Sequence, residues 1–153
     1  MRLKKKYQKI TIGYIDHLEL PEFGINRIPC KIDTGAYTST LHCSDVQLKQ
    51  ENGQTFLCFR LYDPKFGITN KSEFRFSEYQ ERKVRSSNGE VESRYSIKTY
   101  AVLFGRKYRI EFTLSFRDKM KFPILLGRRF LRKRFIVDVS KKDLSANLKT
   151  KDQ

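Results

Sequence analysis

Short segments in which apolar and polar residues alternate follow one another along most of this chain, and turn-forming residues separate them. A period of two places every second side chain on the same face, which is the pattern of a strand that is buried on one side. Only residues 128–134 have the character of a short helix instead. The sequence therefore predicts a mainly β protein, closed or barrel-like, with one short helix near its C-terminal end. The segments expected as strands are 9–15, 27–32, 54–62, 72–76, 83–87, 90–97, 97–104, 108–116 and 135–139.

Hairpin signals join two pairs of these segments. Asn88-Gly89 stands between residues 83–87 and 90–97, and Asn-Gly is the strongest short signal for a two-residue type I′ turn. We expect a projecting hairpin there. Residues 54–62 and 72–76 are separated by Pro and Gly positions, and we expect them to pair as a second hairpin.

The length of 153 residues fits a single domain that can bury a core without disulfides. We expect a basic N-terminal extension over residues 1–9, one domain over residues 10–140 and a polar tail over residues 141–153 that frays. The widely spaced cysteines, Cys30, Cys43 and Cys58, fit reduced thiols better than a disulfide framework.

The charge balance is strongly basic, with 32 Lys and Arg against 17 Asp and Glu, a formal net charge of +15. Such a surface attracts polyanions. No apolar run approaches the ~20 residues that cross a bilayer, so we expect no membrane span. The basic start of the chain is followed by acidic residues where a signal peptide would be apolar, which predicts a cytoplasmic protein.

The segment with the most chemical information is Lys31-Ile-Asp-Thr-Gly-Ala36, because an apolar strand delivers a carboxylate, Asp33, into a turn of small residues. Asp-Thr-Gly alone is weak evidence, since Asp often caps a turn. A second segment stands downstream, Phe122-Pro-Ile-Leu-Leu-Gly127-Arg128-Arg-Phe-Leu131. Together, and in this order, the two segments resemble aspartic peptidases of the retropepsin type.

The resemblance is closest to a bacterial and archaeal branch labelled ATP-dependent zinc proteases, which is linked to ATP-grasp ligases that add glutamates to a ribosomal protein. It extends over about residues 10–140, nearly the whole foldable chain. Beyond the two segments above, it rests on Tyr37-Thr-Ser-Thr-Leu-His42, Val84-Arg-Ser-Ser-Asn-Gly-Glu-Val-Glu-Ser-Arg-Tyr95 and Arg134-Phe-Ile-Val-Asp-Val-Ser140.

This resemblance implies a retropepsin-like closed β-barrel and an aspartic endopeptidase that hydrolyses peptide or glutamyl-peptide bonds. Hydrolysis of an amide without a metal needs two carboxyls that share a proton, and one chain supplies one Asp-Thr-Gly. We therefore expect a homodimer in which the two Asp33 carboxyls meet at the twofold axis and titrate as a unit.

Further roles follow from the same resemblance. Thr34 would brace the pair of carboxyls, and Gly35 with Ala36 would leave room for a substrate backbone. The segment ending in Leu126 and Gly127 would support the loop from behind. The hairpin tip is the candidate for a flap over the substrate, a plain surface hairpin being the alternative; its expected substrate contacts are Ser87, Asn88 and Gly89.

One departure from viral retropepsins changes an expectation. Many of those carry an Asp after Asp-Thr-Gly-Ala that pairs with the later Arg, and here Tyr37 replaces it. Arg128 therefore lacks that partner. We expect Arg128, with Arg85 and Arg94, to face acidic side chains of the substrate, because guanidinium groups suit carboxylates.

No metal or other cofactor is expected, despite the zinc in the family label. Ligands would have to come from His17, His42, the three cysteines and carboxylates, and none of these has the spacing of a zinc motif. A core or hydrogen-bonded His42 is the favoured interpretation. No phosphate-binding loop is present either, so any ATP dependence would come from a partner, such as an ATP-grasp glutamate ligase.

Two other functions stay open at this point. The first is a binding module without catalysis, in which the same scaffold recognises an acidic or ribosome-associated partner, such as a ribosomal protein, through its basic face. The second is an RNA-binding protein, which the charge permits but which lacks the aromatic and basic motif of an RNA-recognition sheet. Nucleic acid is accordingly the less favoured partner.

Overall fold

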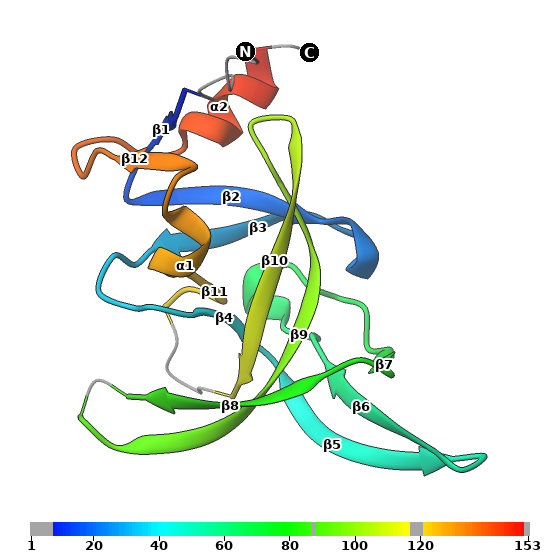
Figure 1. The fold of residues 1–153 in the computed structure, drawn as a ribbon. Coiled ribbons are helices and arrows are strands. Elements are labelled where there is room, and N and C mark those ends of the chain that lie inside the picture. The colour runs from blue at the N-terminus through cyan, green and yellow to red at the C-terminus, as the bar shows by residue number, and fades with distance from the viewer. Residues whose placement is uncertain (1–7, 87, 117–120, 152–153) are drawn as a thin grey trace, which may run out of the picture.

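A computed structural model of the chain describes residues 8–86, 88–116 and 121–151 (Figure 1). These residues form strands, two short α-helices and two single turns of 3-10 helix. The strands are β1 (Ile10–Ile12), β2 (Ile15–Leu20), β3 (Ile25–Ile32), β4 (Ser39–His42), β5 (Ser44–Glu51), β6 (Gln54–Arg60), β7 (Glu73–Phe76), β8 (Gln80–Arg85), β9 (Val91–Leu103), β10 (Arg106–Ser115), β11 (Ile124–Leu126) and β12 (Phe135–Val137). The helical elements are η1 (Pro21–Phe23), η2 (Pro64–Phe66), α1 (Arg128–Leu131) and α2 (Leu144–Lys151).

Six strands close into a barrel in the order β10-β4-β11-β3-β2-β9, and β9 pairs again with β10. The longest ladder joins β9 and β10, from Arg106 opposite Leu103 to Thr113 opposite Ser96. Because the sheet returns to its first strand, most strands have neighbours on both sides. The predicted mainly β barrel is confirmed.

Apolar side chains of alternate strand positions fill the barrel. Leu41 of β4, Phe112 of β10 and Leu126 of β11 have no exposed surface. Leu41 and Phe112 have polar neighbours on both sides, as expected for strands with one buried face, whereas Leu126 belongs to the apolar run of β11. This core fixes the register of the strands around it, because a shift by one residue would turn every apolar side chain outward.

Strand β11 occupies the position that later determines the candidate site. It runs parallel to β3, with Leu126 opposite Ile32, and antiparallel to β4, with Ile124 opposite Leu41. A late segment of the chain is therefore inserted between two early strands. The connection between those two strands, residues 33–38, emerges beside the end of β11.

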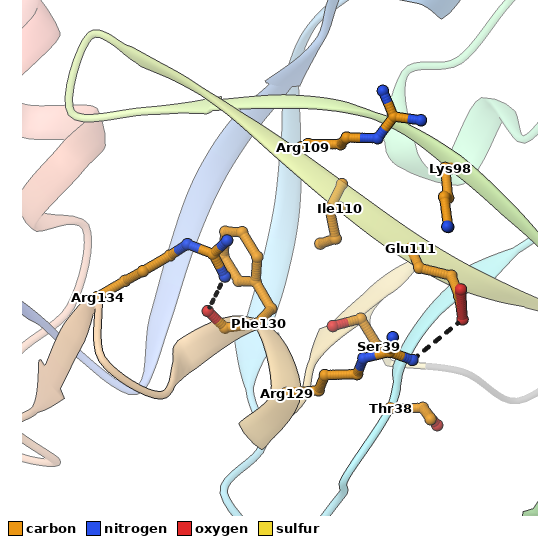
Figure 2. A pocket seen from close by; sticks show the side chains of 9 residues that line it. All are labelled: Thr38, Ser39, Lys98, Arg109, Ile110, Glu111, Arg129, Phe130 and Arg134. Atoms are coloured by element: carbon orange, nitrogen blue, oxygen red, sulfur yellow. Dashed lines mark hydrogen bonds and ion pairs between the residues drawn. The ribbon is translucent and has the colours of Figure 1, made fainter.

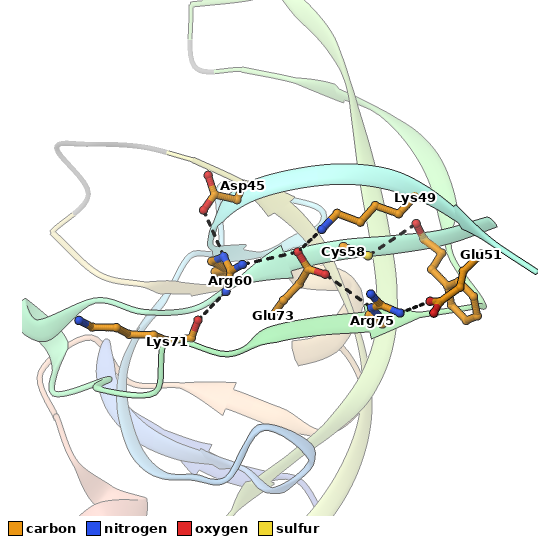
Figure 3. Close-up of polar contacts among 9 residues, drawn as sticks. Asp45, Lys49, Glu51, Cys58, Arg60, Lys71, Glu73 and Arg75 are labelled. Carbon is orange, nitrogen blue, oxygen red and sulfur yellow. Dashed lines mark hydrogen bonds and ion pairs between the residues drawn. The ribbon is translucent and has the colours of Figure 1, made fainter. Parts of the chain in front are cut away.

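A separate three-stranded sheet, in the order β5-β6-β7, adjoins the barrel (Figure 1). Its predicted hairpin, β6 with β7, is confirmed, whereas β5 was not predicted, because its exposed residues hide the alternation. Figure 3 shows the ion pairs on this sheet. The Glu73 carboxylate lies 2.7 Å from Lys49 Nζ, 3.5 Å from Arg75 Nε and 3.8 Å from Arg60 Nη2.

Aromatic rings attach this sheet to the barrel. Phe23, which follows β2, lies 4.9 Å from the ring of Phe74, 5.9 Å from that of Phe76 and 6.0 Å from that of Phe59. These centroid distances and their edge-on or tilted geometries are those of favourable aromatic pairs. The sheet is therefore packed on the barrel through a shared apolar cluster.

The two ends of the domain pair with each other. Strand β1 runs parallel to β12, with Ile10 opposite Phe135. The single strand predicted over residues 9–15 is divided at Gly13, where a Cβ would lie 2.0 Å from the Lys141 carbonyl oxygen. The chain passes so close at this point that only glycine fits.

The polar segment after residue 140 does not fray completely, contrary to the prediction, because it includes helix α2. Asp16 is fully buried, and its carboxylate accepts the backbone N–H groups of Ser145 at 2.9 Å and Ala146 at 3.1 Å. A carboxylate that satisfies free N–H groups at a helix start stabilises the helix. Because its partners are 129 and 130 residues apart from it in sequence, no local pattern reveals this cap.

Neither helix among the described residues has the length and apolar character that a bilayer span needs.

Candidate active site

Asp33 lies directly after β3, at the start of a tight loop. Its backbone N–H donates to the Leu126 carbonyl at 2.8 Å, so the end of β11 fixes its position. Its side-chain Oδ1 accepts the N–H of Gly35 at 3.1 Å, and its carbonyl accepts the N–H of Ala36 at 3.2 Å. The half-buried carboxylate is thereby oriented by its own loop, while Thr34 and Gly35 are exposed.

Gly127 packs against this loop from behind. A Cβ at this position would lie 2.5 Å from the carbonyl oxygen of Thr38, a distance that real Cβ atoms do not adopt. The Gly127 N–H donates to the hydroxyl of Ser39 at 3.0 Å. The sequence analysis did not single out Ser39, whose role becomes visible only once β11 is placed beside β4.

The first turn of α1 binds the same loop through its backbone. The N–H of Arg128 donates to the Ala36 carbonyl at 2.8 Å, and the N–H of Arg129 donates to the Tyr37 carbonyl at 2.9 Å. The first N–H groups of a helix have no partner within the helix, so they are free to hold neighbouring carbonyls. Leu126, Gly127 and the start of α1 therefore form one support for the Asp33 loop.

The Arg128 side chain does have partners, contrary to the expectation from the sequence. Its Nη1 donates to the Thr34 carbonyl at 2.9 Å, and its guanidinium lies 5.9 Å from the centre of the Tyr37 ring. The π face of the Tyr37 ring thus contacts the guanidinium at the position where many viral retropepsins carry an Asp. The side chain remains exposed, so its contacts hold the loop without removing the charge from solvent.

The expected flap is the hairpin of β8 and β9, and Figure 1 shows it extending to the same side of the molecule as the connection between β3 and β4. The predicted two-residue type I′ turn is wrong. The N–H of Ser86 donates to the Glu90 carbonyl at 2.8 Å and the N–H of Gly89 to the Ser86 carbonyl at 3.0 Å, which leaves a three-residue loop. Gly89 has φ +84, as the last residue of such a loop requires.

The residues of this hairpin that were predicted to contact the substrate differ in their exposure. Asn88 is exposed, and its Oδ1 accepts the N–H of Glu90 at 3.2 Å, while Ser87 lies outside the described residues. Arg85 is exposed at the end of β8. Arg94 is not presented to solvent as expected, because its side chain is 5% exposed and lies 2.7 Å from the Glu92 carboxylate.

The histidines and cysteines are distributed as single groups. Within the described residues, no three His, Cys, Asp or Glu side chains form a cluster that could hold a metal ion. His42 Nε2 lies 3.6 Å from Asp63, and the His42 ring stacks on Phe116 at 5.6 Å between centroids. The three cysteines are buried and unpaired, and burial raises the pKa of the Cys43 thiol to about 12.

Comparison with known proteins assigns the chain to a family. The family described as the retropepsin-like aspartic endopeptidase RimB matches residues 11–147. The chain belongs to this RimB-like family. The match includes every residue that supports the Asp33 loop.

Two curated relatives of this RimB-like chain are each named a probable alpha-L-glutamate ligase. The one from Desulfotalea psychrophila is 32% identical over 130 residues, which is 85% of this chain and 28% of the relative. The one from Shewanella halifaxensis is 30% identical over 132 residues, which is 86% of this chain and 29% of the relative. The chain thus spans less than a third of the length of these relatives.

A solved structure supports the fold. A protein of unknown function from Legionella pneumophila superposes on this chain with a TM-score of 0.72 and 22% sequence identity. The superposition covers 90% of this chain and 99% of that one. The likeness therefore extends over the whole barrel.

Proposed function

We propose that this protein is an aspartic peptidase in which two Asp33 carboxyls, one from each chain of a homodimer, hydrolyse a peptide or glutamyl-peptide bond. The observation that carries the proposal is the support of the Asp33 loop by Leu126, Gly127 and the start of α1, which leaves the carboxylate oriented and partly accessible. Such a rigid loop is what a catalytic carboxylate needs.

The dimer follows from the chemistry. One carboxylate must take a proton from the attacking water while the other gives a proton to the carbonyl oxygen. Among the described residues, the group that bonds to the Asp33 carboxylate is the N–H of Gly35, not a second carboxyl. A twofold contact between two Asp33 loops would supply the missing group, and the pair would share one proton.

Individual residues have distinct parts in this reaction. The Gly35 N–H holds Oδ1 of Asp33, which leaves the other oxygen to face water. Thr34 is exposed at the tip of the loop, where it would meet its symmetry mate and brace the pair. The hairpin of β8 and β9, with Asn88 and Gly89 at its tip, would close over an extended substrate and exclude bulk water.

The substrate is proposed to be acidic. The chain has a net charge of +15, and Arg85 and Arg128 are exposed guanidinium groups in segments that belong to the family pattern. The matched relatives carry a segment like this one within a longer polypeptide named a glutamate ligase. A peptide that bears added glutamates, such as a modified ribosomal protein, would fit both observations. A glutamate ligase would then be the functional partner, and the cytoplasm would be the compartment.

A second candidate is a binding module that uses the same surface without hydrolysis. It is favoured by the surroundings of Asp33 in the single chain, because among the described residues its carboxylate bonds to the Gly35 N–H and to no other carboxyl. Both functions predict binding of a glutamate-rich peptide, and only the peptidase predicts its cleavage.

The deciding experiment incubates the protein with a glutamate-rich peptide and follows cleavage by mass spectrometry. Asp33→Asn should abolish hydrolysis and leave binding intact. Asp45→Asn is the matched control, because it makes the same chemical change at an exposed aspartate of β5 and should leave hydrolysis unchanged. Binding without cleavage by the unaltered protein, at every pH where it stays folded and dimeric, would establish the binding module instead.

A further inference from the structure

Strand β9 has a free backbone edge in the middle of the barrel wall. On one side β10 pairs with β9 from Ser96 to Leu103. On the other side β8 reaches only as far as Ser96, and β2 pairs only at Val102. Among the residues that the structure describes, 97–101 thus have no strand partner on that side. A free edge of this kind can accept an extended peptide as an added strand.

A cavity of about 890 Å³ follows this edge, and we call it the β9 groove. Three consecutive residues, Lys98, Thr99 and Tyr100, all line it. Because successive side chains of a strand point to opposite faces, a single cavity borders all three only when it runs along the edge of the strand. The opposite walls come from η1, β6 and the corner between β7 and β8.

Two buried hydroxyl groups in the β9 groove lack hydrogen-bond partners. Ser96 and Thr99 are 2% and 1% exposed, and neither Ser96 Oγ nor Thr99 Oγ1 has a partner among the described residues. Buried polar groups are nearly always satisfied, and leaving one unpaired is costly. Both oxygens are themselves closed to solvent, and residues three apart in a strand point to opposite faces, so these hydroxyls mark incomplete pairing beside the groove and are not part of the surface that a ligand contacts.

The β9 groove continues into a smaller cavity of about 270 Å³ beside α1, which Figure 2 shows. The two cavities share Lys98, Arg109 and Glu111, and Arg129 and Arg134 also line the smaller one. We call the smaller cavity the basic pocket. Arg134 is held in place there, because its Nη1 donates to the Phe130 carbonyl at 2.8 Å.

The carboxylate in the basic pocket is already neutralised. Glu111 accepts two hydrogen bonds from Arg82, at 3.0 and 3.1 Å, and lies 3.4 Å from Arg129. Neither Lys98 nor Arg109 has a carboxylate within ion-pair distance among the described residues; Arg109 contacts Tyr100, with its hydroxyl at 3.5 Å and its ring centre at 5.9 Å. The shared wall of the two cavities therefore offers free positive charge.

Charge divides this surface into two ends. Glu22 and Glu78 line only the β9 groove, and Arg75, which also lines it, is paired with Glu51 and Glu73, whereas Arg129 and Arg134 line only the basic pocket. A uniformly acidic strand such as a nucleic acid backbone would meet carboxylates along half of its path. An extended peptide that is acidic at one end and neutral at the other matches both ends.

We propose that the β9 groove and the basic pocket form one docking site for an extended peptide, which adds as a strand to residues 97–101 and places its acidic end over Lys98 and Arg109. Asp33 lines neither cavity, so the site is separate from the candidate catalytic carboxylate, although Thr38 at the end of the Asp33 loop lines the basic pocket and makes the two sites neighbours. The docked peptide is a segment of a partner protein, and its binding does not depend on hydrolysis.

The test measures binding of a labelled probe peptide by fluorescence anisotropy, with Asp33→Asn protein so that cleavage cannot interfere. The probe has three glutamates at one end, followed by alternating Thr and Val, and a second probe carries the glutamates at the other end. Matched probes replace Glu by Gln. We expect at least one acidic probe to bind more tightly than its Gln counterpart, and Lys98→Ala or Arg109→Ala to weaken it roughly fivefold each. Arg106→Ala, which removes the same charge from β10 outside both cavities, should leave binding unchanged.

A further measurement separates strand addition from general charge attraction. Methylating alternate amides of the probe should abolish binding for one set of amides and not for the other, since only one set faces the edge of β9. Equal binding of both methylated probes, loss of affinity in Arg106→Ala equal to that in Arg109→Ala, or tighter binding of a single-stranded RNA than of either probe would each overturn the proposal.

Discussion

Gly127 lies so close to Thr38 that a Cβ on Gly127 would be 2.5 Å from the Thr38 carbonyl oxygen and 2.8 Å from that of Tyr37. Both obstacles are backbone atoms, and the strands on either side hold them in place. The Asp33 loop therefore depends on one residue without a side chain, 94 positions later in the chain.

Gly127→Ala should consequently destabilise the protein and displace the Asp33 loop. Overpacking in a core usually costs about 1–3 kcal/mol, and a contact with backbone falls toward the upper end because no side chain can rotate away. Urea unfolding gives the loss of stability. Gly35→Ala is the comparison, because its Cβ would meet only the Asp33 Oδ1, at 3.3 Å. An equal or smaller loss at Gly127 would contradict the close approach.

Asp16→Asn should loosen helix α2. In the unaltered protein the two carboxylate oxygens accept the N–H groups of Ser145 and Ala146. An Asn side chain has one acceptor oxygen, so its N–H₂ group would face one of these two N–H groups and leave it without an acceptor. An unsatisfied buried donor costs about 1–3 kcal/mol. The checks are urea unfolding and faster hydrogen exchange at these two amides. Asp45→Asn serves again as control, and unchanged exchange in Asp16→Asn would show that α2 does not depend on this cap.

The barrel could be predicted because its information is local. Alternation in residues 97–104 and 108–116 predicted two strands, which are the second part of β9 and β10, and runs such as residues 27–32 predicted further buried strands; the continuation of residues 90–97 into the same strand β9 was not predicted. What failed were features that depend on distant contacts. Strand β5 carries few buried residues, and helix α2 is stabilised by Asp16 from the other end of the chain.

In the candidate site too, features with a local sequence pattern could be predicted, and features that depend on distant contacts could not. Asp33 and Gly127 were found through motifs, since their positions in a strand, a turn and an apolar run are visible in the sequence. The partners of Arg128 were not, because a backbone carbonyl and the face of Tyr37 leave no sequence pattern. The burial of Arg94 was missed for a related reason: its neighbours Ser93 and Tyr95 give no apolar alternation to mark the inward face.

Glu73 should make stability depend on pH at the acidic end. Its hydrogen bond from Lys49 holds the pKa of the carboxyl below its ordinary value of 4.5. The stabilisation is therefore complete above that value, and it is lost as the pH falls through the lowered pKa of the folded state. Thermal unfolding should show Glu73→Gln less stable than the unaltered protein at neutral pH, with the difference vanishing once the pH has fallen below the lowered pKa of the folded state. Glu81→Gln, at an exposed position of β8, should show no such difference, and a gap for Glu73→Gln that persists in acid would argue against the ion pair.

Arg128→Ala distinguishes a residue that positions the Asp33 loop from one that binds the substrate. The contacts of Arg128 with the Thr34 carbonyl and the Tyr37 ring favour the first role, and their loss should cost about 1 kcal/mol of stability. If the proposed peptidase activity holds, kcat should then fall with little change in KM, and Arg128→Lys should not restore it, because an ammonium group lacks the planar shape for this stack. Binding of a glutamate-rich peptide, measured with Asp33→Asn also present, gives the independent readout. Weaker binding after Arg128→Ala would mean that the guanidinium contacts acidic substrate side chains as well, whereas unchanged binding would restrict Arg128 to the loop.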